Sequence, residues 1–204
     1  KTLGYVPSSA RAAKATVDVT LNTNTASATM PAGTVFSTKV GDTTFQFSTI
    51  EAFTKSNTGN SIPFVGVDIY EGTFITTRYT VDSSDIDQRF LLTDNRADTS
   101  TLIVKVQTSS TDSTSTTFTE ATDITQVTSG SNVFFLQEVE AGLFEVYFGD
   151  GIIGAEPKDG DQISISYDFE ELKGELNFDL INADNNEILL SKGERLTNRH
   201  NREF

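Results

Sequence analysis

The chain contains no cysteine and no tryptophan, and only one histidine and one methionine among its 204 residues. Without cysteine it can form no disulfide framework, no thiolate metal site and no cysteine nucleophile. His200 is the only imidazole, which excludes most nucleophilic triads. The patterns GxSxG and GxxxxGKS are also missing, which removes two common catalytic and phosphate-binding loops. We therefore expect neither an enzyme nor a cofactor-binding protein.

Long apolar runs are missing as well. No segment approaches the roughly 20 apolar residues that a membrane-spanning helix requires. The first residues, KTLGYVPSSARAAKA, contain no apolar stretch long enough for a signal peptide. The chain does not begin with Met, which is compatible with a fragment of a longer protein. We expect no membrane partner.

Basic residues are few, and acidic residues dominate. There are 15 Lys and Arg residues against 29 Asp and Glu residues, which gives a formal net charge of −14. A surface this acidic repels the phosphate backbone of nucleic acids, so we expect no nucleic-acid partner. The simplest role for the acidity is solubility.

Strands dominate the predicted structure, because helix-forming segments are scarce and β-branched residues are abundant. Residues 15–21 alternate apolar and polar side chains, which is typical of a half-buried strand. Similar segments recur every 8–14 residues with turn signals between them, which indicates antiparallel sheets. The predicted fold class is all-β: two small antiparallel β-sandwich or barrel-like subdomains with a short hairpin-plus-helix tail.

Three parts of the chain are expected. Asp and Ser are dense at 82–87, which indicates a boundary near 81–88. The predicted parts are an N-terminal β subdomain at 1–81, a second β subdomain at 82–167 and a tail at 168–204. Residues 108–131 are of low complexity, and we expect them to be exposed and mobile around a short strand near Phe118.

The stretch LFEVYFGDGIIGAEPKDGDQISISY, residues 143–167, raises the question of whether Asp150 does chemistry. A general acid or base needs a second group or a shifted environment, and the neighbours of Asp150 in sequence are Gly149, Gly151 and two isoleucines. Neither Asp150 nor Asp159 has the ligand spacing of the helix-loop-helix calcium motif, so we expect no metal site.

A structural turn explains these residues better. Glycines adopt positive φ without steric cost, and an Asp side chain can accept hydrogen bonds from backbone N–H groups of its own turn. Ile152 and Ile153 are then expected to insert into the sheet. The predicted turn residues are Gly149, Asp150, Gly151, Gly154 and Gly160.

The same stretch resembles the baseplate wedge and baseplate J-like proteins of contractile-tailed phages. The resemblance rests on FEVYFGDGIIGAEPKDGDQISISY, on LGYVPSSARAAKATVDVTL and on MPAGTVFSTKVGDTTFQFST, and it covers about residues 2–167. It implies a β-rich, non-enzymatic virion protein of the tail baseplate, assembled in the host cytoplasm. Its implied partners are other wedge proteins and copies of itself, with no small-molecule substrate.

The tail departs from that pattern. Residues from about 174 to 204, which include ELNFDLINADNNEILLSKGERLTNRHNREF, resemble a segment of the bacterial RNA polymerase β subunit, with Lys192–Thr197 and Arg199-His200 carrying the match. Thr197 is then expected to cap a helix. Asn201 stands where that family has an apolar residue, and every polymerase catalytic motif is missing. Either the likeness is due to chance or the chain joins unrelated pieces; we favour the second. His200 is expected at the surface.

The leading functional hypothesis is a structural subunit of a phage tail baseplate wedge that acts through protein–protein assembly without catalysis. The alternative is a fragment of an RNA polymerase β subunit, or a chain joining the two. A third hypothesis, suggested by the Thr- and Ser-rich strands, is a secreted carbohydrate-binding sandwich, and it ranks last.

Overall fold

The fold is nearly all β, so the all-β prediction is confirmed. The structure is a computed structural model that describes residues 9–41, 43–85, 87–112, 114–169, 180–181 and 188–190. Within these residues the only helices are two short 3-10 turns, Ile124–Gln126 and Glu140–Gly142. No helix in the described part of the chain is long and apolar enough to cross a membrane.

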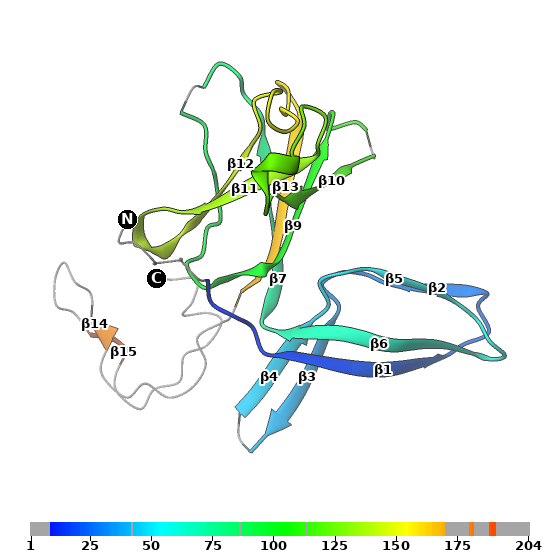
Figure 1. The fold of residues 1–204 in the computed structure, drawn as a ribbon. Coiled ribbons are helices and arrows are strands. Elements are labelled where there is room, and N and C mark those ends of the chain that lie inside the picture. Colours follow the sequence, from blue (N-terminus) through cyan, green and yellow to red (C-terminus); the bar gives the residue numbers. More distant parts are fainter. Residues whose placement is uncertain are drawn as a thin grey trace.

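The first sheet is four-stranded and curves like half of a barrel. Its strand order is β1-β6-β4-β3, and all its described pairings are antiparallel. A two-stranded sheet, β2-β5, lies beside it (Figure 1). The bounds are β1 Lys14–Asn22, β2 Ser27–Met30, β3 Val35–Val40, β4 Thr43–Ser48, β5 Phe53–Ser56 and β6 Ser61–Glu71.

The second sheet is seven-stranded and nearly closes into a barrel. Its order is β7-β13-β9-β10-β11-β12-β8. The hydroxyl of Tyr79 on β7 donates to the carbonyl of Leu91 on β8 at 2.6 Å, which links the two outer strands. The bounds are β7 Thr73–Thr80, β8 Phe90–Leu91, β9 Ala97–Gln107, β10 Thr116–Glu120, β11 Val133–Glu138, β12 Phe144–Phe148 and β13 Gln162–Phe169.

The change from one sheet to the other occurs at Gly72, earlier than the predicted boundary near 81–88. Strand β7, which was assigned to the N-terminal subdomain, pairs with β13 in the second sheet. Residues 168 and 169, which were assigned to the tail, complete β13. The Asp- and Ser-rich segment is therefore a loop of the second sheet. The division into separate domains stays a prediction.

Gly72 allows this change because only glycine fits there. Its φ is 140°, and a Cβ atom at this position would lie 2.6 Å from Oδ2 of Asp168. The amide of Gly72 donates to the carbonyl of Gln46 in the first sheet at 3.0 Å. The chain thus passes between sheets through one tightly packed residue.

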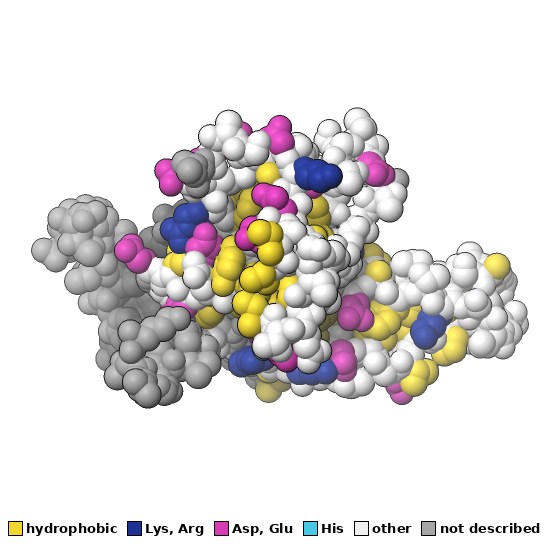
Figure 2. Space-filling view, turned by 45° about the horizontal axis from the view of Figure 1, so that its top comes forward, with side chains coloured by type: hydrophobic (Ala, Val, Ile, Leu, Met, Phe, Trp, Pro, Cys, Tyr) yellow, Lys and Arg dark blue, Asp and Glu magenta, His cyan; other side chains and the backbone are white. Residues whose placement is uncertain are grey.

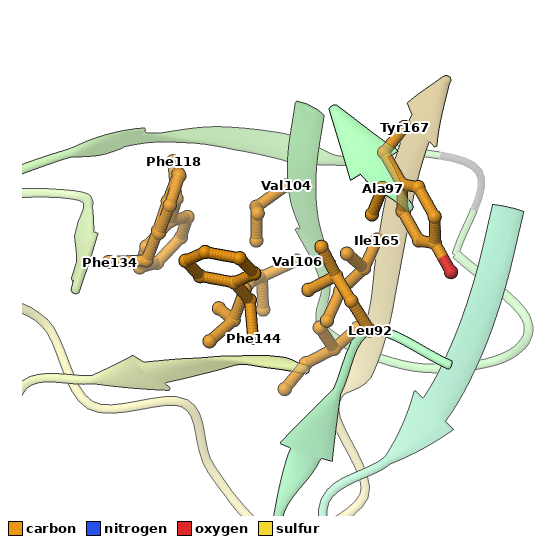
Figure 3. Packing of buried hydrophobic residues seen from close by; sticks show 11 residues of the cluster. Leu92, Ala97, Val104, Val106, Phe118, Phe134, Phe144, Ile165 and Tyr167 are labelled. Atoms are coloured by element: carbon orange, nitrogen blue, oxygen red, sulfur yellow. The ribbon is translucent and has the colours of Figure 1, made fainter. Parts of the chain in front are cut away.

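Each sheet has its own core, in line with the alternating sequence pattern. The smaller core consists of Ile62, Phe64, Val67 and Ile69, all on β6. The larger core lies inside the seven-stranded sheet, where side chains from several strands point toward one another (Figure 3). Its buried members are Leu92, Ala97, Val104, Val106, Phe118, Phe134, Phe144, Val146, Ile163, Ile165 and Tyr167.

Two further predictions can be compared with the structure. The strand near Phe118 is confirmed as β10, but its pairing with β11 is parallel, unlike the predicted antiparallel pattern. In the tail, β14 Leu180–Ile181 pairs antiparallel with β15 Ile188–Leu190, as expected for a hairpin. The predicted helix, with Thr197 and His200, lies outside the described residues.

Candidate functional site

The FGDG segment forms a compact loop between β12 and β13. Oδ1 of Asp150 accepts hydrogen bonds from the amides of Ile152 and Ile153, each at 2.9 Å. The amide of Gly151 donates to the carbonyl of Gly154 at 3.1 Å and closes the loop on itself. These backbone N–H groups stabilise the charged carboxylate, so they lower the pKa of Asp150. The carboxylate is therefore engaged in shaping its own loop.

The glycines of this loop serve different purposes. Gly151 and Gly154 have φ of 78° and 88°, a conformation that favours glycine. Gly149 has no positive φ, contrary to the expectation. It is required instead for close packing, since a Cβ atom there would lie 2.5 Å from the carbonyl carbon of Gly154. The loop backbone folds directly onto Gly149.

Ile152 and Ile153 do not insert into the sheet, so that expectation was wrong. Their exposed fractions are 75% and 43%. The inward position is taken by Gly154, which is buried and would place a Cβ atom 3.1 Å from Val133 on β11. The loop backbone is thus held by internal hydrogen bonds, and the two isoleucine side chains are exposed to solvent.

Gly160 lies in a second turn, residues 157–161, which is hydrogen-bonded to the segment that follows β7. Gly160 has φ of 84°, and its amide donates to the carbonyl of Val81 at 2.9 Å. Oδ1 of Asp159 accepts from the amide of Ser83 at 3.0 Å, and Oδ2 of Asp161 from the amide of Lys158 at 2.8 Å. Both carboxylates bind backbone groups of the turn region.

These predicted turn residues form two separate loops and do not converge on one centre. Among the described residues, no three His, Cys, Asp or Glu side chains are placed to hold a metal ion together. In both loops the Asp side chains accept hydrogen bonds from backbone amides and so stabilise the loop conformation.

A polar network that the sequence did not predict lies on the outer side of β12. Arg89 donates from Nε and Nη2 to the two carboxylate oxygens of Glu145, at 2.9 and 2.7 Å. Gln137 donates to the same carboxylate at 2.9 Å. The Arg89 hydrogen bonds lower the pKa of Glu145, although its burial opposes this. No sequence signal pairs residues that are 56 positions apart, because their proximity depends on strand order.

Beside this network, Phe135 and Tyr147 stack across β11 and β12 with ring centroids 5.3 Å apart. Tyr147 is 42% exposed. Hydrophobic side chains gather in the middle of the face of the molecule that Figure 2 shows, with acidic side chains around them. Tyr, Phe and Arg are residue types enriched at protein–protein interfaces.

The chain matches no protein-family model, and no curated protein is similar to it at a significant level.

Proposed function

We propose that this chain is a structural subunit of a phage tail baseplate wedge, which acts by assembling with other wedge proteins and performs no reaction. The observation that carries the proposal is the loop at Asp150. Its carboxylate is occupied by two backbone amides, and the loop that it stiffens presents Ile152 and Ile153 outward. Such a loop is suited to docking and poorly suited to catalysis.

The joint between the two sheets supports the same function. Buried Asp168 on β13 accepts a hydrogen bond from Ser48 on β4 at 3.0 Å, and Gly72 packs closely against it. A subunit that transmits force or fixes the position of its neighbours needs rigid joints of this kind. The ordered sequence resemblance over residues 2–167 supplies the particular assembly, a contractile tail.

The RNA polymerase alternative depends on residues 174–204. Of these residues the structure describes the β14-β15 pair, and a short antiparallel pair is common to many unrelated proteins. It therefore adds no specific support to that alternative.

The test is to purify contractile tail particles from cells that encode this chain, to analyse them by mass spectrometry and to label them with an antibody against the chain. We expect the chain in the particles and the label at the baseplate end. Recovery of the chain with RNA polymerase, and its absence from the tails, would overturn the proposal.

A further inference from the structure

Strand β3 ends the four-stranded sheet, and its outer edge has no neighbouring strand among the described residues. The β3-β4 hairpin projects away from the seven-stranded sheet (Figure 1). Such an edge offers backbone N–H and C=O groups to another strand. Many edge strands are protected by bulges or several charges, but Lys39 is the only charged residue on β3.

Three of the six side chains of β3 are apolar. Val35 and Val40 are 53% and 64% exposed at the two ends of the strand. Phe36 lies opposite Phe47 and, with Thr38, lines a shallow hollow of about 480 Å³ on the concave side. Because side chains alternate, Val40 shares this concave side with Phe36 and Thr38. On this side the edge thus carries two apolar side chains, Phe36 and Val40, with Thr38 between them, and Val40 is largely exposed.

The charge distribution indicates which partner can approach. Residues 1–71 carry five basic and five acidic side chains, whereas residues 73–169 carry five basic and sixteen acidic ones. Two copies that met through the seven-stranded sheet would repel each other strongly, but the neutral half-barrel allows like chains to meet. The β3 edge belongs to this neutral half, and its single charge, that of Lys39, is positive.

We propose that two copies of this chain pair through their β3 strands, antiparallel and across a two-fold axis at Thr38. In this register Phe36 of one copy lies opposite Val40 of the other on the concave side, and Thr38 lies opposite Thr38. On the convex side Lys39 lies opposite Ser37, so no two like charges are directly opposed. The two four-stranded sheets become one continuous sheet. The contact deepens the proposed assembly role, and its biological meaning rests on that role.

The neighbouring register is less favourable. With the axis at Ser37, Phe36 would lie opposite Thr38 and Val35 opposite Lys39, which separates the apolar side chains from one another. Register follows the apolar pattern where one face of a sheet is covered, so the Thr38 axis is preferred.

The absence of cysteine allows a direct test. Single variants of the 204-residue chain, Thr38→Cys, Ser37→Cys and Thr44→Cys, are oxidised at micromolar concentration and the disulfide-linked dimer is measured. Directly opposed residues of antiparallel strands are close enough for a disulfide, so we expect Thr38→Cys to cross-link about tenfold faster than the other two. Thr44 on β4 is the exposed control away from the edge. Faster cross-linking of Ser37→Cys would overturn the proposed register.

A second pair of variants measures affinity by sedimentation. Val40→Asp should weaken the dimer at least about tenfold, because it places a charge opposite Phe36. Val65→Asp, at a residue 69% exposed on β6, should leave the dimer unchanged. A wild-type chain that stays monomeric at high concentration overturns the inference. If a monomeric chain is still found in tails, the dimer proposal fails and the proposed function stands. If the chain dimerises as proposed but is absent from tails, the dimer proposal stands and the proposed function fails.

Discussion

The hydroxyl of Ser48 donates to Oδ1 of Asp168 at 3.0 Å, and both residues are buried although 120 positions separate them in the chain. Ser48 is the last residue of β4, and Asp168 lies in β13. The amide of Asp168 also donates to the hydroxyl of Thr101 on β9 at 2.9 Å. One carboxylate-bearing residue thus joins both sheets.

Ser48→Ala should destabilise the protein by about 1–3 kcal/mol, because it removes a hydrogen-bond donor to the buried carboxyl group of Asp168. Urea denaturation measures the change in the free energy of unfolding. Ser56→Ala, at an exposed position on β5, is the matched control and should have little effect. Equal stability of the two variants would contradict the role of Ser48 at the joint.

Gly149→Ala should destabilise the protein by about 2 kcal/mol or more, because the added Cβ atom meets the backbone of Ile153 and Gly154. Backbone atoms move less easily than the end of a flexible side chain. Gly130→Ala is the control, since nothing lies within 4 Å of the Cβ position there. Thermal denaturation of both variants checks the prediction, and a Gly149→Ala protein as stable as the control would refute it.

The loop at Asp150 should loosen at acidic pH. The backbone amides of Ile153 and Ile152 lower the pKa of Asp150 in the folded protein below its unfolded value. The stabilising contribution is therefore present above the unfolded pKa and is lost as pH falls through the folded pKa. Hydrogen exchange at Ile152 and Ile153, corrected for the intrinsic rate at each pH, should show strong protection at neutral pH that declines in acid.

Asp150→Ala should remove this pH dependence, because the acceptor is then missing at every pH. Asp150→Asn keeps one side-chain oxygen as an acceptor and should retain part of the protection without the acid transition. Unchanged protection in Asp150→Ala would mean that the carboxylate does not hold the loop.

Glu145→Ala should cost about 1–3 kcal/mol of stability at neutral pH, since it removes the nearly buried acceptor of Arg89 and Gln137. The pKa of Glu145 is lowered in the fold, so its contribution is present above the unfolded pKa and declines as pH falls through the folded pKa. The stability difference from wild type should shrink in acid. Glu138→Ala, exposed on β11, should show no such difference.

Much of the local structure was predictable from the sequence. Alternating residues in β13 place Ile163, Ile165 and Tyr167 on one side, and all three are buried as their pattern indicates. The hairpin between β11 and β12 was predicted from two apolar segments around a short connection. These features depend on contacts between residues close in the chain, so a short window of sequence contains the information.

The hydrogen bonding of Asp150 within its loop was predictable from the sequence, but the direction of the Ile152 and Ile153 side chains was not. The side chain of an Asp between glycines binds the nearest amides, which is a local event. Whether Ile152 and Ile153 point inward depends on what already fills the space beneath them. Here Gly154 packs against Val133 of another strand, and the isoleucines remain outside.

By itself the sequence determined the all-β class, the positions of most strands and the turn chemistry of Asp150 and Gly160, because alternation and backbone freedom act over a few residues. Only the tertiary structure decided that the sheets change at Gly72, that β10 runs parallel to β11, and that Arg89 meets Glu145. The alternation of residues in a strand indicates which of its sides is apolar. It does not indicate which strand lies next to it, because strand order depends on how distant segments pack together.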